Sequence, residues 1–299
     1  MARTGASGKT HEDAAGAATT VALVANEGSG TSNPALCAER LNAFGAEVKL
    51  FDLDELDAAV GSGADRVVVA GGDGSIAPVA AAAGAAGIPL AVIPAGTAND
   101  FARRLGLPDG ATAACRLAVC GTRLRSLELG WMNDERPFVN VASAGLPAPA
   151  AEHASSWKER LGPLAYAAGA VTAGLRAKPL TCLVRCDGGR ELLAGEAWQV
   201  TVAAAGAFGA GATVPEADPG DGALEVIAIE AGPRLGLVGL AYRLRSGTLT
   251  SHPRAYHARC ENAEVQVPDR TQFNVDGELV TAGAARFRAV KAAFRLVVG

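Results

Sequence analysis

Two glycine-rich loops carry the residues most capable of chemistry in this sequence. Residues 71–75 (GGDGS) follow an apolar run at 66–70, and residues 94–103 (PAGTANDFAR) follow another at 90–93. Glycines lack a Cβ, so their backbone N–H groups can approach phosphate oxygens closely, and a following helix adds the positive end of its dipole. The two loops together therefore predict a phosphate-binding cleft.

Polar side chains within these loops could complete such a site. Asp73 is a carboxylate that could hold Mg²⁺ or take a proton from an acceptor, while Thr97 offers a hydroxyl and Asn99 an amide. Taken alone, GGDG is equally typical of an ordinary turn whose aspartate caps a helix. The second loop favours phosphate binding, because two such loops one strand–helix–strand unit apart would face each other across one cleft.

The elements that position the loops alternate between strands and helices. Strands are predicted at residues 21–25, 47–51, 66–70 and 90–93, and helices at residues 34–44, 53–60 and 76–86. This alternation indicates a parallel, doubly wound, Rossmann-like sheet, whose ligands bind beyond the carboxyl ends of its strands. The uncharged run from Gly74 to Asn99 contains three prolines. We therefore interpret it as buried interior and not as a membrane-spanning helix.

The second half of the chain has a different pattern of predicted elements, with short strands in place of alternating strands and helices. Short strands are predicted at residues 127–129, 138–142, 180–186, 198–203, 224–229, 264–267 and 287–297, with helical stretches around 157–174 and 234–246. Turn residues separate them, which is typical of an antiparallel β-sandwich. At about 150 residues per domain the length suggests two domains. We predict a disordered tail at 1–19, a nucleotide domain at 20–130 and a β-rich domain at 131–299, whose last residues could return to the first domain.

An ordered series of motifs resembles the catalytic domain of the diacylglycerol kinase family, in particular bacterial diacylglycerol and sphingosine-kinase-like lipid kinases. Besides the two loops, the series comprises residues 26–30 (NEGSG), 157–166 (WKERLGPLAY), 208–211 (FGAG), 215–222 (PEADPGDG) and 274–278 (NVDGE). The resemblance covers most of the chain from Val21. It implies a nucleotide domain like that of NAD kinases and phosphofructokinases, a β-sandwich, and an active site between them. The implied activity is ATP- and Mg²⁺-dependent phosphorylation of a hydroxyl of diacylglycerol or a related lipid.

The resemblance also implies roles for individual residues. The ATP-binding residues would be Asn26, Gly30, Gly71, Gly72, Asp73, Gly74, Ser75, Thr97 and Asn99. The ligands of a structural Mg²⁺ would be Asp218, Asp221 and the main-chain carbonyl of Ala223. Asp276 or Glu278 would be the general base that takes the proton of the lipid hydroxyl, with Asp73 as the competing candidate. Taken alone, DPGDG would be a turn and VDGE a type I′ hairpin, so these roles depend on the order of the motifs.

Two other functions stay open. The first is a kinase for a soluble substrate, such as an NAD kinase, against which PAGTANDFAR and the order of DPGDG and VDGE argue. The second is a nucleotide-binding regulatory protein with weakened catalysis. It is motivated by Ala77 and Pro78, which stand where the family usually has Asn-Glu, and by Leu146 and Pro147, which stand near a usual Asp.

Composition excludes several classes of protein. The 27 Lys and Arg residues against 31 Asp and Glu give a net charge of −4, with 19% charged and 49% hydrophobic residues. These values exclude an acidic disordered chain and a generally basic nucleic-acid binder.

The six cysteines form no C-x-x-C pair and are expected to be reduced, small apolar residues. With no signal-peptide pattern, we expect a cytoplasmic protein.

One segment suggests how the chain could reach a lipid. Residues 231–260 contain no acidic residue but five arginines and two histidines, with a strongly apolar stretch at 235–245. We hypothesise that this basic segment lies near the lipid entrance, at about 1 kcal/mol of attraction to anionic head groups per Arg. A core-packed helix with solvated arginines is the alternative. We expect peripheral association with the inner face of the membrane, and a homodimer stays open.

Overall fold

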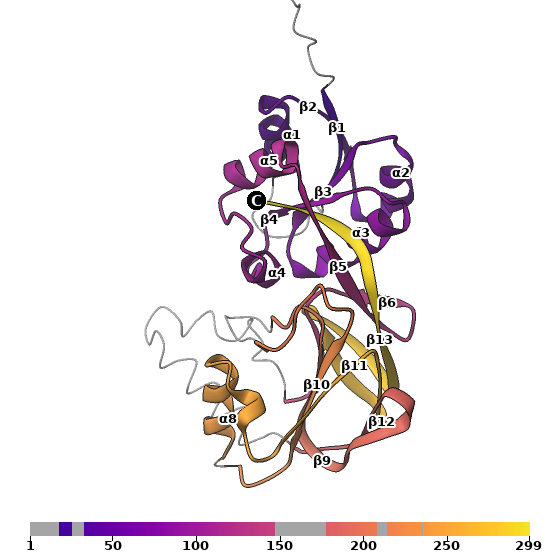
Figure 1. The fold of residues 1–299 in the computed structure, drawn as a ribbon, viewed down its shortest axis with the longest axis vertical. Coiled ribbons are helices and arrows are strands. Elements are labelled where there is room, and N and C mark those ends of the chain that lie inside the picture. Colours follow the sequence, from indigo (N-terminus) through magenta and orange to yellow (C-terminus); the bar gives the residue numbers. More distant parts are fainter. Residues whose placement is uncertain (1–17, 26–32, 147–177, 208–213, 235) are drawn as a thin grey trace, which may run out of the picture.

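The structure, a computed structural model, describes residues 18–25, 33–146, 178–207, 214–234 and 236–299. Two lobes are arranged one above the other, with the helices concentrated in the N-terminal lobe and long strands in the second (Figure 1). No helix among these residues is long and apolar enough to cross a membrane.

Four parallel strands form the sheet of the N-terminal lobe, in the spatial order β2, β1, β3, β4. Their bounds are β1 (Thr19–Ala25), β2 (Ala46–Phe51), β3 (Arg66–Gly71) and β4 (Leu90–Pro94). The apolar runs of β1, β3 and β4 are almost entirely buried. Parallel strands are covered on both faces in this way when helices pack on each side of the sheet.

Helices cover the two faces of this sheet and create two separate cores. Helices α1 (Pro34–Ala43) and α5 (Ala111–Cys120) pack on one face. On the other face lie the 3-10 turn η1 (Leu53–Glu55) and helices α2 (Leu56–Gly61) and α3 (Asp73–Ala85). The uncharged run of the sequence forms α3 and β4 in this interior. A short helix, α4 (Asp100–Arg104), follows β4 beyond the carboxyl edge of the sheet.

The second lobe is an antiparallel β-sandwich. Its strands are β7 (Val141–Gly145), β8 (Leu180–Cys186), β9 (Arg190–Ala203), β10 (Leu224–Glu230), β11 (Ala255–Cys260), β12 (Asn262–Val275) and the first part of β13 (Glu278–Val298). Both β9 and β12 pair with β8 through their first halves and with β7 through their second halves. Two layers result, and they enclose a single apolar core.

Smaller elements complete the second lobe. The 3-10 turn η2 (Asp187–Gly189) connects β8 to β9, and η3 (Leu249–Ser251) precedes β11. Helix α8 (Gly236–Arg245) lies against the outside of the sandwich, where Leu237 and Leu240 pack with Ile227 and Ile229 of β10. This part of the basic segment is thus anchored to the fold by its apolar residues.

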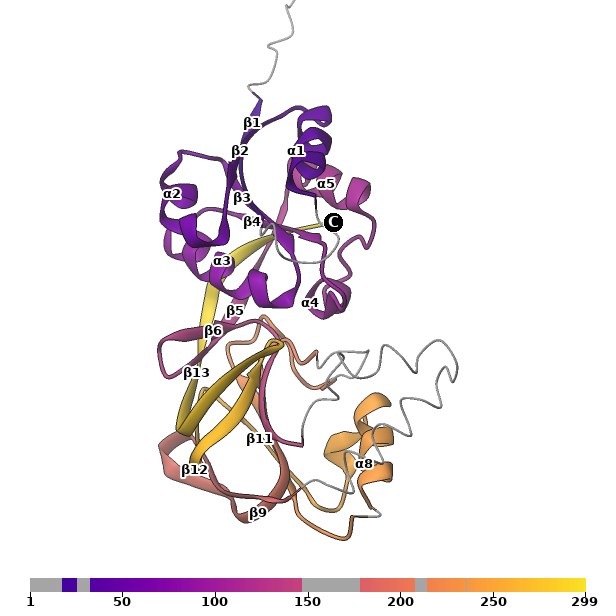
Figure 2. The same ribbon diagram turned by 180° about the vertical axis from the view of Figure 1, so that it is seen from behind.

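Strand β13 joins the two lobes. It is 21 residues long, and Figures 1 and 2 show it running from the second lobe up into the first. Its first part pairs with β12, its later part pairs antiparallel with β5 (Arg123–Met132), and Leu296 lies in parallel register with Leu90 of β4. A hairpin links β5 to β6 (Arg136–Phe138). The same strand therefore belongs to both lobes and limits how far they can move apart.

Arg104 adds a second connection between the lobes. From the end of α4, its guanidinium donates to the carbonyl oxygens of Ala205, Pro215 and Ala217, at 3.1, 3.2 and 2.6 Å. All three acceptors belong to the second lobe. A single partly buried side chain thus fixes the end of α4 relative to residue 205 and residues 215–217.

Candidate active site

The two glycine-rich loops meet at the carboxyl edge of the parallel sheet. The Ala95 N–H donates to the Gly71 carbonyl at 3.0 Å. A Cβ built on Gly72 would lie 3.2 Å from the Gly96 Cα, and one built on Gly96 would lie 2.5 Å from the Gly72 Cα. The two backbones approach so closely that a side chain at either position would meet the other loop. Both loops therefore need a glycine at this contact.

The first loop leads directly into α3. Gly72 is extended and occupies the N-cap, so the helix begins at Asp73, three residues earlier than the predicted start at Ile76. Residues 73–75 therefore form its first turn, and the positive end of a 13-residue helix points into the loop region. The Ser75 side chain packs on Gly71, where an added Cβ would lie 2.9 Å from the Ser75 Cβ.

Asp73 ties the first loop to the second. Its two carboxylate oxygens accept the N–H groups of Asp100 and Phe101, at 3.1 and 2.9 Å, which are the first N–H groups of α4. Asn99 is left-handed, with φ 51°, and its side-chain amide accepts from and donates to the backbone of Gly96. Asn99 thus shapes the second loop from within, whereas Thr97 is exposed at its tip.

Replacing Asp73 by asparagine is expected to lower the free energy of unfolding by about 1 kcal/mol, the usual worth of a helix cap. An amide offers one acceptor oxygen, so one of the two α4 N–H groups would face an NH₂ donor. Urea denaturation of the wild type and of the Asp73→Asn variant measures this difference. Equal midpoints would contradict the capping role.

The NVDGE motif forms the turn between β12 and β13. Asp276 and Gly277 both have positive φ, 48° and 96°, as a two-residue type I′ hairpin requires. The Asp276 carboxylate accepts three backbone N–H groups, from Val139 at 2.7 Å, Asn140 at 3.0 Å and Val141 at 2.9 Å. The side chain is therefore held rigidly, at the place where the chain passes from β6 into β7.

Burial dominates the electrostatics of Asp276. Loss of water around the carboxylate raises the pKa of Asp276 to about 7, with the negative charge of Asp73 adding to the shift and the three backbone N–H groups opposing it. The result is a fixed carboxyl group that changes its protonation state near neutral pH.

The NVDGE turn faces the GGDGS loop across the junction of the lobes. A Cβ on Gly74 would lie 3.3 Å from Glu278 Oε1 and 3.7 Å from the Asp276 carbonyl oxygen. Glu278 Oε2 is paired with Arg136 Nη1 at 2.5 Å. Residues some two hundred positions apart in the sequence are thus brought together. The three candidate bases, Asp73, Asp276 and Glu278, lie around one site.

The predicted metal ligands lie in the turn before β10. Asp218 Oδ1 accepts from the Gly220 N–H and from Arg125 Nη2, at 3.1 and 2.9 Å. Asp221 accepts the Ala223 N–H at 2.9 Å and pairs with Arg259 at 2.6 Å. Both arginine side chains are about half exposed, at 45% and 54%.

Glu128 on β5 completes this acidic group, and its side chain was not predicted as a site residue. One of its oxygens accepts the Gly222 N–H, while the other, Oε1, is buried without a hydrogen-bond partner among the described residues. Burial, with smaller contributions from Asp221 and Asp218, raises the pKa of Glu128 to about 7.

Within the described part of the chain no three His, Cys, Asp or Glu side chains gather as a metal cluster. Arg125 and Arg259 meet the charges of Asp218 and Asp221, so the orphaned Glu128 oxygen beside them is the observation that favours a cation here.

Several predicted features lie outside the described residues or differ from the family pattern. Asn26 and Gly30, the stretch 157–166 and the run 208–211 are not described. Ala77, where the family usually has a polar residue, lies on α3 and is buried in the apolar core that this helix forms with the sheet. Leu146 packs beside the core under α8, and its N–H donates to the Trp198 carbonyl at 2.9 Å.

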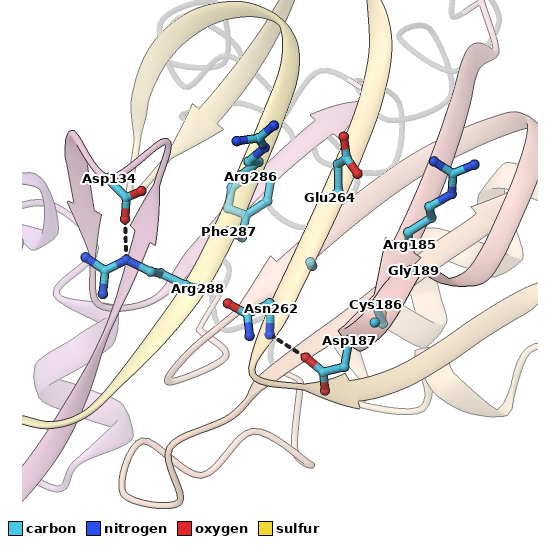
Figure 3. A pocket seen from close by; sticks show the side chains of 12 residues that line it. Asp134, Arg185, Cys186, Asp187, Gly189, Asn262, Glu264, Arg286, Phe287 and Arg288 are labelled. Carbon is cyan, nitrogen blue, oxygen red and sulfur yellow. Dashed lines mark hydrogen bonds and ion pairs between the residues drawn. The ribbon is translucent and has the colours of Figure 1, made fainter.

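A pocket of about 270 Å³ lies away from this site, on the β-sandwich (Figure 3). It contains none of the predicted site residues. Its charged side chains balance in sign: Arg185, Arg286 and Arg288 stand against Asp134, Asp187 and Glu264. The lining therefore carries no net charge that would attract an anion or a cation.

Family models match both lobes. Residues 20–132 match the "Diacylglycerol kinase catalytic domain", and residues 140–298 match the "YegS C-terminal NAD kinase beta sandwich-like domain". The chain belongs to the diacylglycerol kinase family. The chain is 29% identical over 250 residues to a diacylglycerol kinase of Mycobacterium tuberculosis, in a match that covers 81% of this chain and 79% of the relative. It is 31% identical over 238 residues to a "Probable lipid kinase YegS-like" of Pectobacterium atrosepticum, with 77% of each chain covered.

Solved structures agree with the fold of this chain. A crystal structure described as a diacylglycerol kinase from Bacillus anthracis superposes with a TM-score of 0.71 at 19% identity, covering 94% of this chain and 98% of that chain. The predicted fold class, a doubly wound nucleotide domain with an antiparallel β-sandwich, is thereby confirmed, as is the family that the ordered motifs indicated.

Proposed function

We propose that this member of the diacylglycerol kinase family is a lipid kinase that transfers the γ-phosphate of Mg²⁺-bound ATP to a hydroxyl of diacylglycerol or a related lipid. The observation that supports this best is the approach of the NVDGE turn to the GGDGS loop, with Glu278 Oε1 3.3 Å from a Cβ on Gly74. A phosphate held by the loop amides would lie beside the turn that carries Asp276 and Glu278. Phosphoryl transfer requires mainly such positioning and charge stabilisation.

The nucleotide phosphates are assigned to the loop amides. Residues 71–75 would cradle them at the N-terminus of α3, and the exposed hydroxyl of Thr97 would contact them from the second loop. Asn26 and Gly30 are retained as further ATP-binding residues. Asn99 would act indirectly, since its amide is used to hold Gly96.

Asp276 is the general base in this proposal. The lipid oxygen attacks the γ-phosphorus, the bond from phosphorus to the ADP oxygen breaks, and the hydroxyl proton passes to the Asp276 carboxylate. A pKa near 7 suits a base that works at neutral pH. The oxygens of Asp73 and of Asp276 all accept backbone N–H groups, so these contacts do not separate the two. Asp276 is chosen for its pKa, Asp73 stays the competing candidate, and Glu278 is less suitable because it is paired with Arg136.

A structural Mg²⁺ bound by Asp218, Asp221 and the Ala223 carbonyl remains part of the proposal. EDTA is expected to lower the Tm of the nucleotide-free wild type by about 5 °C, because loss of a cation bound only to the folded state destabilises it. The Asp221→Asn variant, with one ligand charge removed, should respond less to EDTA. A wild-type Tm that EDTA leaves unchanged would contradict metal binding here.

Lipid access is proposed to occur at a membrane surface, with a cytoplasmic protein associating peripherally. Two of the five arginines in residues 231–260 serve the fold: Arg254 donates to the Ala231 carbonyl at 2.8 Å, and Arg259 pairs with Asp221. Arg243, on α8, is the arginine of this segment that we assign to any attraction to anionic head groups. Sedimentation with liposomes of varied anionic lipid content tests this part separately.

The proposed activity is tested by incubating the protein with γ-labelled ATP and Mg²⁺, offering a total lipid extract in one sample and NAD in another. Label is expected in a lipid product. Label in NAD would support a soluble-substrate kinase instead. Tight ATP binding without transfer to any lipid would support a nucleotide-binding regulatory protein.

A further inference from the structure

Arg136 occupies a position that the proposed chemistry has not used. It begins β6, and β6 packs against α3, the helix whose first turn belongs to the GGDGS loop. Its Nη1 lies 2.5 Å from Glu278 Oε2, while the other oxygen of Glu278 lies 3.3 Å from a Cβ on Gly74. The Arg136 guanidinium is therefore separated from the loop by only one carboxylate group.

Other arginines beside the loops are committed to the fold. Arg103 binds Asp100 at 2.8 Å and the Ala98 carbonyl at 2.6 Å. Arg104 binds three backbone carbonyls of the second lobe. Arg136, in contrast, pairs with the side chain of Glu278, and the two side chains are 42% and 57% exposed. A solvent-exposed pair of this kind stabilises little, so a stronger anion can replace Glu278.

The carboxyl groups around the GGDGS loop would repel a bound triphosphate unless a cation lay nearby. Asp73, Asp276 and Glu278 place three carboxyl groups around the region where a triphosphate would lie. Arginine can hold phosphate oxygens through two parallel hydrogen bonds, and its charge persists at any physiological pH. A guanidinium moving from Glu278 to the phosphates would counter this repulsion.

We propose that Arg136 is a phosphate-binding residue of this site: it leaves Glu278 and contacts the terminal phosphate of a nucleoside triphosphate bound at the GGDGS loop. This inference rests on the proposed nucleotide site. Glu278 then acts as the resting partner of Arg136 and competes with the phosphate for it.

Calorimetric titration of the wild type with ATP, ADP and AMP, in the presence of Mg²⁺, tests this inference. In Arg136→Gln, the Kd for ATP is expected to rise by about 10- to 100-fold, which is the worth of a charge-assisted hydrogen bond, while the Kd for AMP stays the same. Arg136→Lys should recover part of the affinity for ATP. Glu278→Gln, which removes the competing carboxylate, should bind ATP at least as tightly as the wild type.

A matched control lies between the turn of the same β5–β6 hairpin and β13. Arg288 pairs with Asp134, at similar exposed fractions of 42% and 70%, in the pocket of Figure 3. Arg288→Gln removes a comparable ion pair outside the proposed site and should leave the Kd for ATP unchanged. Thermal melts of every variant establish that the chains are folded.

The outcomes separate the inference from the function on which it rests. A wild type that binds no ATP overturns the proposed nucleotide site itself. A wild type that binds ATP, with Arg136→Gln binding it equally well, overturns the role of Arg136 alone. An equal loss of ATP affinity in Arg136→Gln and Glu278→Gln would show that Arg136 only positions Glu278, which also contradicts direct phosphate contact.

Discussion

Replacing Asp276 by asparagine is expected to lower kcat by about 10²- to 10⁴-fold, the usual contribution of a general base. The variant keeps a side chain of the same size at the turn, so β12 and β13 should still pair. Initial rates of lipid phosphorylation measure the effect, and circular dichroism with a thermal melt shows that the variant is folded. A variant with more than about a tenth of the wild-type kcat would contradict a base at this position.

The pH dependence of kcat, measured for the wild type and for Asp276→Asn, gives an independent check. A base must be deprotonated to act, so the wild-type kcat should rise with pH through about 7, the pKa of Asp276. The residual activity of Asp276→Asn should lack this rise. A wild-type profile that is flat between pH 6 and 8 would argue against Asp276.

The contribution of Asp276 to the free energy of unfolding should fall as the pH rises, whereas kcat should rise. Because the folded state holds Asp276 at a pKa above its ordinary 3.8, it favours the protonated carboxyl. The stabilisation is complete below about pH 4 and is lost as the pH rises through about 7. Asparagine does not titrate, so the difference in free energy of unfolding between wild type and variant should shrink from pH 5 to pH 8. Urea denaturation at the two pH values measures it.

Gly72→Asp is expected to weaken ATP binding by more than about 100-fold, because a charge is placed among the phosphate-binding amides and their hydrogen bonds are lost. Its Cβ would also lie 3.2 Å from the Gly96 Cα, pushing the two loops apart. Calorimetric titration with ATP measures the loss.

Gly110→Asp provides the matched control for Gly72→Asp. Gly110 is the N-cap of α5, and a Cβ built there meets nothing within 4 Å. The same carboxylate should be tolerated at this position, with ATP affinity and Tm close to those of the wild type. ATP affinity that falls equally in both variants would show that an added negative charge, and not the loop, is responsible.

Local sequence patterns account for most of the nucleotide domain. The apolar runs of β1, β3 and β4 and the loops that end them are visible in the sequence because a buried parallel strand needs a continuous apolar stretch. Helix α3 starts at Asp73 and not at Ile76, since an extended Gly72 serves as the N-cap. Helix α5 and strand β11 were not predicted. The residues of β11, AYHARC, include exposed polar side chains, because it pairs with β10 alone at the edge of the sheet.

The site could be predicted only as far as its motifs extend. The sequence indicated the loops and the turn, and the structure brings Asp73, Asp276 and Glu278 together. Arg136 and Glu128 lie in no motif, and their partners are 142 and 94 residues away in the chain. The backbone N–H groups that hold Asp276 carry no residue signature at all, since any residue at 139–141 except proline would supply them.

Transfer of labelled phosphate from ATP to diacylglycerol in detergent micelles is the most direct measurement of the proposed activity, with wild type and Asp276→Asn compared at pH 8. Wild-type protein is expected to form phosphorylated diacylglycerol, or the phosphorylated form of a related lipid when that lipid is supplied, and the variant is expected to form almost none. Label that stays in ATP for every lipid offered, or equal rates for the two proteins, would contradict a lipid kinase site built around Asp276.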